Sequence, residues 1–181
     1  EVPLGDKVTL VGGLRYTDNS RDAIFLNRSF IFNSGPSRQN FTGVTPLILG
    51  SDESKVTWLA GVNYQPNSDT LVFAKVSTGF KGGGFDSVGD YRPETNTAYE
   101  LGWKQSFGPS SEHQINLGAF YYDYKDLQVS VLLDTAVGGQ TFNAGAATIW
   151  GLEAAADFKV GPHTTLRASV NYLNAKYDEL F

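Results

Sequence analysis

Three glutamates, Glu94, Glu100 and Glu153, are the residues of this sequence with the most obvious capacity for acid–base chemistry. Two carboxyl groups held at a suitable distance can hydrolyse a glycosidic bond. All three, however, lie on or beside segments in which charged and apolar residues alternate, and a barrel strand commonly carries charge at every second position into a wet interior. We therefore interpret them as structural charges and predict that the protein is not an enzyme.

The two histidines, His113 and His163, both fall at tight turns. Because the sequence contains no cysteine and no clustered third ligand, we interpret them as solvated turn residues and predict no metal site. A serine hydrolase would need a Ser–His pair on adjacent strands, and neither histidine is placed for one. Gly79, Gly82 and Gly84 lack the following helix that a phosphate-binding loop requires, so we interpret them as loop glycines and expect no cofactor.

The composition excludes several other classes of protein. The 181 residues include no Cys, which removes disulfide frameworks, and no Met, which indicates a processed chain or a fragment. The net charge of −5 disfavours nucleic acid as a partner, because phosphate binding needs a basic surface. No run approaches about 18 consecutive apolar residues, so we expect no transmembrane helix. The lack of such a run does not exclude a transmembrane β-barrel, because barrel strands carry polar residues at alternate positions.

The clearest element is the strand that ends at Phe107. One set of alternate positions (one parity) carries Tyr99, Leu101, Trp103 and Phe107, and the other set carries Glu100, Gly102, Lys104 and Ser106. This alternation predicts a β-strand with one apolar and one polar face. The same alternation predicts about seven strands: Val8–Thr17, Lys55–Gln65, Thr70–Phe80, Tyr99–Phe107, Gln114–Asp126, Thr148–Phe158 and Thr165–Lys176. Together with the connection lengths and the aromatic positions described next, it predicts an all-β, antiparallel, up-and-down transmembrane β-barrel segment.

The connections between these strands alternate in length. Tight ones near residues 66–69, 108–112 and 160–164 are predicted at one end of the strands, and long ones near 18–54, 81–93 and 132–146 at the other. The segment 18–54 is predicted to be a polar connection whose middle, residues 30–32, could extend a strand. Outer-membrane barrels have this asymmetry, with short periplasmic turns and long extracellular loops.

Aromatic residues recur on the apolar parity near both ends of the strands. Tyr99 and Phe107 are eight residues apart, which is about 26 Å along a strand and, with tilt, about 20 Å along the membrane normal, close to the height of a barrel's apolar band. The predicted lipid-facing girdle is Trp58, Tyr64, Tyr99, Trp103, Phe107, Trp150 and Phe158. The predicted lumen-facing charges are Arg15, Lys75, Glu100, Lys104, Glu153 and Asp157.

Five segments together resemble the β-barrel of TonB-dependent outer-membrane receptors: GLRYT at Gly13–Thr17, VSTGFKGGGFD at Val76–Asp86, RPETNTAYELGWKQSF at Arg92–Phe107, AFYYDYKDLQV at Ala119–Val129 and NAGAATIWGLEAAADF at Asn143–Phe158. Their order and spacing follow the family across most of the chain. The resemblance implies a barrel of about 22 strands around an N-terminal plug. It also implies uptake of scarce solutes (ferric siderophores, haem, cobalamin or saccharides) driven by the inner-membrane TonB complex.

The sequence departs from the family pattern in three respects. It shows no plug sequence, no TonB box (the short N-terminal segment that the energising protein binds) and no recognisable final strand. We therefore expect residues 1–181 to be an internal part of the barrel domain, with the plug and the remaining strands absent. About seven strands are too few to close so wide a wall, since diameter grows with strand number. The expected fold is an open, curved sheet with unpaired edges near Val8–Thr17 and Thr165–Lys176.

The expected function is that of a receptor and transporter segment in the bacterial outer membrane. Its expected partners are outer-membrane lipid, the TonB complex through the rest of the parent protein, and a small solute such as a ferric siderophore. Arg and Tyr suit anionic, catechol-rich or sugar ligands, and the candidate ligand contacts are the loop residues Arg21, Arg28, Arg38, Tyr91, Arg92, Gln140 and Asn143; each could instead be an ordinary solvated side chain. A passive porin-like or structural barrel and a soluble β-rich binding module are the alternatives.

Overall fold

The computed structural model describes residues 1–26, 30–31, 40–41, 46–86, 89–134, 138–143 and 145–179. Across these ranges the chain consists of strands and their connections. No helix within them is long and apolar enough to cross a membrane.

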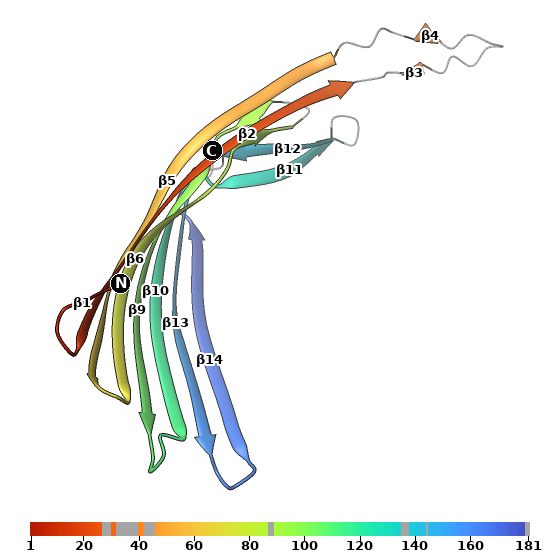
Figure 1. Ribbon diagram of the computed structural model, residues 1–181. Coiled ribbons are helices and arrows are strands. Elements are labelled where there is room, and N and C mark those ends of the chain that lie inside the picture. The colour runs from red at the N-terminus through yellow and green to blue at the C-terminus, as the bar shows by residue number, and fades with distance from the viewer. Residues whose placement is uncertain are drawn as a thin grey trace.

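One large antiparallel sheet organises the chain, and its strands neighbour one another in sequence order (Figure 1). The order is β1 (Val2–Pro3), β2 (Val8–Leu26), β5 (Pro46–Asn67), β6 (Thr70–Lys81), β9 (Glu94–Phe107), β10 (His113–Lys125), β13 (Ala146–Lys159) and β14 (Thr165–Tyr177). Within the described residues β1 and β14 do not pair, so the sheet is open, as predicted. The edge expected at Val8–Thr17 is partly covered, because β1 pairs with Thr9 and Leu10.

Among the described residues, three short hairpins lie in the long connections, in addition to the large sheet. They pair β3 (Phe30–Ile31) with β4 (Asn40–Phe41), β7 (Gly84–Phe85) with β8 (Asp90–Tyr91), and β11 (Gln128–Asp134) with β12 (Gly138–Asn143). The prediction of a long loop over 132–146 is therefore wrong for 132–134 and 138–143. Gly138 and Gly139, which lie within that predicted loop, pair with Asp134 and Leu132 in a bulged ladder.

Strand pairing sorts the side chains of the sheet onto two faces, because directly paired residues of an antiparallel sheet share a face. Tyr64 of β5 pairs with Val72 of β6, and Val72 pairs with Trp103 of β9. These three residues, and the alternate residues of their strands, therefore lie on one face. The aromatic face, so defined, holds Trp58, Tyr64, Tyr99, Trp103, Phe107, Trp150 and Phe158. The opposite, polar face holds Arg15, Lys75, Glu100, Lys104, Glu153 and Asp157.

Aromatic rings gather at both ends of the aromatic face. At the long-loop end Tyr99 lies 6.2 Å from Tyr121 between ring centroids, and Trp150 lies 5.3 Å from Tyr172. At the tight-turn end Phe107 and Phe158 are 5.9 Å apart. These separations suit favourable edge and tilted contacts between aromatic rings.

His113 joins the ring cluster at the tight-turn end, which corrects its interpretation as a solvated residue. Its ring centroid is 5.2 Å from that of Phe107 and 5.8 Å from that of Phe158. Its Nδ1 accepts a hydrogen bond from the backbone N–H of Lys159 at 3.2 Å. Strand β13 supplies Phe158 and Lys159, and strand β9 supplies Phe107.

Hydrogen bonds to carboxylates stabilise the tight turns. Asp69 accepts bonds from the hydroxyls of Ser111 at 2.6 Å and Ser68 at 3.0 Å, and these bonds lower the pKa of the Asp69 carboxyl. Hydrogen bonds from its own backbone N–H and from that of Ser110, the latter at 2.8 Å, lower the pKa of the Glu112 carboxyl. The Ser111–Asp69 bond also joins two successive turns, because the two residues belong to different hairpins.

The polar face is the more crowded one. The buried apolar residues of the described chain, Ala98 and Ala147, lie on it, and so do the buried glycines Gly102 and Gly151. The rings of Phe73 and Phe120 lie over these two glycines. Such crowding is expected on the concave side of the curved sheet, where side chains converge.

Strands β2 and β5 continue far beyond the other strands as a two-stranded ribbon (Figure 1). Their pairing runs without a break from Val8 with Tyr64 to Leu26 with Pro46. The prediction of a polar connection over 18–54 is therefore wrong for 18–26 and 46–54. Both faces of the ribbon carry polar residues, so the alternation that marks a half-buried strand is missing there.

Candidate functional site

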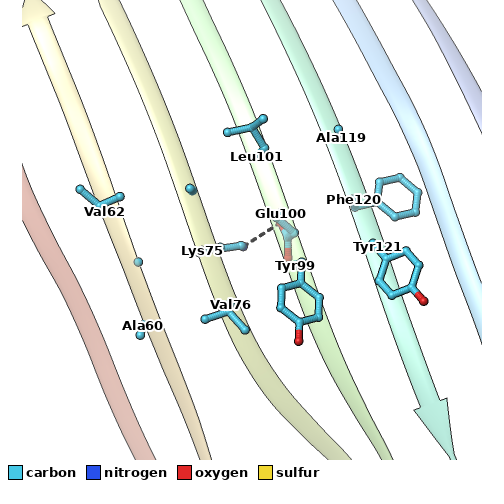
Figure 2. A pocket seen from close by; sticks show the side chains of 12 residues that line it. Ala60, Val62, Lys75, Val76, Tyr99, Glu100, Leu101, Ala119, Phe120 and Tyr121 are labelled. Carbon is cyan, nitrogen blue, oxygen red and sulfur yellow. Dashed lines mark ion pairs between the residues drawn. The ribbon is translucent and has the colours of Figure 1, made fainter.

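The polar face carries an ion pair near the middle of the sheet. Lys75 Nζ lies 2.9 Å from Glu100 Oε2, and the side chains are about a third exposed. Figure 2 shows this pair bridging β6 and β9, with Phe120 on the adjacent strand β10. Asp157 pairs with Arg167 at 3.5 Å, whereas Arg15, Lys104 and Glu153 have no ion pair within the described part of the chain.

The connection after β6 bends onto the polar face of the β2–β5 ribbon. The N–H of Gly83 donates to Glu53 Oε2 at 3.0 Å, and Arg21 Nη1 donates to the carbonyl of Gly83 at 3.3 Å. Arg21 and Glu53 share the parity of Arg15, so the segment at 82–83 lies on that face. Gly83 is required there, since a Cβ would meet the Glu53 carboxylate and the Tyr91 carbonyl.

The β11–β12 hairpin is attached to this inward-folded connection. The N–H of Thr141 donates to Asp86 Oδ2 at 2.6 Å. Gln128 Nε2 donates to the carbonyls of Gly82 and Arg92, both at 3.0 Å. The N–H of Gln128 donates to Glu94 Oε2 at 2.9 Å. Three connections therefore form one hydrogen-bonded rim at the long-loop end of the sheet.

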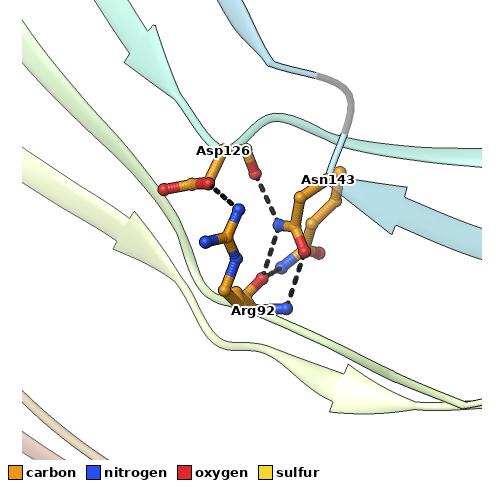
Figure 3. Close-up of polar contacts among 4 residues, drawn as sticks. Arg92, Asp126 and Asn143 are labelled. Carbon is orange, nitrogen blue, oxygen red and sulfur yellow. Dashed lines mark hydrogen bonds and ion pairs between the residues drawn. The ribbon is translucent and has the colours of Figure 1, made fainter. Parts of the chain in front are cut away.

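Asn143 and Arg92 complete the rim (Figure 3). Asn143 Oδ1 accepts the N–H of Arg92 at 2.7 Å, and Asn143 Nδ2 donates to the carbonyls of Arg92 and Asp126, both at 2.8 Å. The Arg92 guanidinium lies 2.6 Å from Asp126 Oδ1. One amide side chain thus holds three backbone groups of two connections that lie far apart in the sequence.

The rim residues proposed as ligand contacts are largely engaged by the protein itself. Arg21 contacts Gly83, and Arg92 and Asn143 bind each other and Asp126. The ring of Tyr91 lies against the buried Gly84. Gln140 is half-buried in β12, and Arg28 and Arg38 lie outside the described residues. Sequence reasoning missed the rim roles of Glu53, Asp86 and Gln128, for which no local motif exists.

We expect Asn143→Ala to loosen the rim. The amide of Arg92 loses its acceptor, and one hydrogen bond contributes about 0.5–1.5 kcal/mol, so this amide should exchange up to about tenfold faster in hydrogen–deuterium exchange. Arg92→Gln is the control, because it removes only an exposed ion pair, whose typical contribution is about 0–1 kcal/mol. Faster exchange in Arg92→Gln than in Asn143→Ala would contradict this assignment of the rim contacts.

The sequence matches the family described as TonB dependent receptor-like, beta-barrel, over residues 1–180. The chain belongs to this family. It is a family of outer-membrane receptors and transporters rather than enzymes. No curated protein sequence matches the chain.

Solved structures of TonB-dependent receptors share the fold of this family member. The ferric yersiniabactin uptake receptor FyuA from Yersinia pestis has a TM-score of 0.72 and 19% identity, over 98% of this chain and 26% of that receptor. The siderophore receptor PiuA from Acinetobacter baumannii has a TM-score of 0.70 and 16% identity, over 96% of this chain and 24% of that receptor. The FrpB iron transporter from Neisseria meningitidis has a TM-score of 0.66 and 18% identity, over 97% of this chain and 25% of that transporter. The chain therefore spans about a quarter of the length of these receptors.

Proposed function

We propose that residues 1–181 form part of the barrel wall of an outer-membrane receptor that takes up a scarce solute, energised through the TonB complex. The solute is a ferric siderophore, haem, cobalamin or a saccharide. In this receptor the aromatic face contacts lipid and the polar face lines the lumen. The plug and the remaining strands belong to other parts of the parent protein.

The observation that carries this proposal is the rim. In a family of receptor barrels, connections that fold onto the polar face and bond to one another narrow the entrance to the lumen and present polar groups there. The exposed belt of large apolar side chains on the opposite face, including Leu101, Leu117 and Leu152, fits a lipid environment and not a soluble binding module.

Uptake by the complete receptor tests the proposal. Cells that lack their own receptors would express it and be offered radioactive iron as ferric yersiniabactin, as a ferric catecholate and as haem. We expect accumulation of one of these that is lost when TonB is deleted. Liposome swelling with small sugars is the counterpart for a passive pore. Swelling together with TonB-independent accumulation would overturn the proposal in favour of a porin-like barrel.

A further inference from the structure

A polar cavity of about 460 Å³ lies where the β2–β5 ribbon separates from β6. Regular pairing of β5 with β6 ends at Leu59 with Ser77. At the next position the Thr78 hydroxyl takes the place of a backbone partner for Trp58. It accepts the N–H of Trp58 at 3.0 Å and donates to the Trp58 carbonyl at 3.5 Å. From this point the two strands diverge, and the wedge cavity opens between the ribbon and the end of β6.

The wedge cavity lies on the polar face. Five residues of β2 line it: Arg15, Thr17, Asp18, Asn19 and Arg21. All but Asp18 are alternate residues that share one side of the strand. Thr57, the partner of Arg15 in β5, continues the lining on that side. The connection after β6 closes the cavity at Gly82, where a Cβ would lie 3.2 Å from Asn19 Nδ2 and 3.3 Å from Glu53 Oε2.

The charges in the wedge cavity are not balanced. Arg15 has no hydrogen bond or ion pair within the part of the chain that the structure describes, and the hydrogen-bond partner of Arg21 is a neutral carbonyl. Two acids are near. Asp18 lies on the opposite parity of β2, and Glu53 already accepts the N–H of Gly83 at 3.0 Å and the hydroxyl of Ser51 at 3.4 Å. Two guanidinium groups therefore face the cavity, and neither forms an ion pair among the described residues.

A hydroxyl in the wedge cavity also lacks a partner. Thr17 Oγ1 is shielded from solvent and makes no hydrogen bond among the described residues. A buried polar group without a hydrogen bond costs free energy, commonly about 1–3 kcal/mol. A ligand oxygen would satisfy this hydroxyl while it neutralises the two cations.

We propose that the wedge cavity is a subsite for an anionic oxygen group, a carboxylate or a phosphate, of the transported solute. Arg15 and Arg21 supply the charge and paired donors that fit such groups, and Thr17 supplies a further donor. The volume lies within the range of small-ligand sites, about 300–1,000 Å³, so it admits one arm of a larger solute. This inference rests on the proposed function for the identity of the solute, and the polar face points to the lumen and not to a lipid headgroup.

Binding to the purified complete receptor tests the wedge cavity. Citrate and inorganic phosphate are the probes, and titration calorimetry at two salt concentrations is the measurement. We expect binding that weakens with salt, and a loss of affinity of about tenfold or more in Arg15→Gln and in Arg21→Gln. Arg15→Lys should recover part of this loss, because it keeps the charge but not the paired donors.

Arg167→Gln is the matched control, since it removes an arginine from the same face of the sheet at a distant position. Its affinity for citrate should equal that of the wild type. Equal losses in Arg15→Gln and Arg167→Gln, or no binding of either anion to the wild type, would overturn the subsite. Folding of each variant is checked by its heat-modifiable migration in gels, and Arg15→Gln is the decisive variant because Arg21 also contacts Gly83.

Two further comparisons separate the sources of failure. Nanodiscs with and without lipopolysaccharide distinguish a solute from a lipid phosphate: we expect the same citrate affinity in both, and Arg15-dependent retention of lipopolysaccharide would overturn the assignment to a solute. The binding assay requires neither TonB nor transport. Citrate binding without TonB-dependent uptake would therefore contradict the proposed function alone, whereas uptake with unchanged binding in Arg15→Gln would contradict the subsite alone.

Discussion

Replacing Trp103 by arginine is expected to lower the free energy of unfolding of the complete receptor in lipid vesicles by about 2–4 kcal/mol, the cost of a cation on the lipid face near the bilayer midplane. Trp103 pairs with Val72 and Leu117 on the aromatic face. It lies four residues from Tyr99 and four from Phe107, midway between the two groups of aromatic rings. An arginine there would have to reach either interface along an apolar surface.

Lys104→Ala is the control for Trp103→Arg. Lys104 is the next residue along β9, so it occupies the same depth, but its side chain lies on the polar face, where it pairs with the position of Asn116. It has no ion pair among the described residues, so its removal should change the free energy of unfolding by well under about 1 kcal/mol. Equal effects of the two substitutions, or a larger effect at Lys104, would reverse the assignment of the faces.

The second large effect is expected at Gly151, on the crowded polar face. A Cβ at this position would lie 2.5 Å from the carbonyl oxygen of Tyr172 on β14 and 2.5 Å from the Phe120 ring. The backbone oxygen belongs to a paired strand and cannot move without disturbing the ladder. Gly151→Ala should therefore destabilise the receptor by about 1–3 kcal/mol, the range for overpacking, measured by the same unfolding experiment.

Gly118→Ala is the matched control for Gly151→Ala. Gly118 lies on the same face, in the adjacent strand β10, and its nearest obstacle would be Glu153 Oε2 at 3.7 Å, an ordinary contact. Its substitution should be close to neutral. Phe120→Ala should rescue Gly151→Ala only in part, because the Tyr172 carbonyl remains. Full rescue by Phe120→Ala, or equal destabilisation by the two glycine substitutions, would refute the role of the backbone contact.

The alternation of residue types by itself determined the sheet and its two faces. In β9 the period of two between Tyr99 and Phe107 decides which side chains share a side, because successive side chains of a strand point to opposite faces. Short Pro- and Gly-containing turns then require each strand to pair with the next, which leaves little freedom in the order of the strands. For this reason the seven long strands could be predicted without coordinates. The openness of the sheet followed from their number, which is too small for the wide barrel that the family resemblance implies.

Where both faces of a strand are solvated, alternation carries no signal, and only the tertiary structure decided the outcome. The ribbon over 18–26 and 46–54 is such a case, since its pairing depends on an unbroken ladder that starts in the apolar part of β2 and β5. The β11–β12 hairpin is another, because its sequence combines strand residues with the two glycines of its bulged ladder.

The rim and the wedge cavity depend on contacts between residues far apart in the chain. Glu53 meets Gly83, Asn143 meets Arg92, and Arg15 and Gly79 line one cavity. The sequence marked Arg21, Arg92 and Asn143 as polar loop residues, but it could not show that the protein itself satisfies much of their hydrogen-bonding capacity. Hydrogen bonds form between groups that the curvature and divergence of strands bring within about 3 Å, and no local pattern of residues encodes that approach.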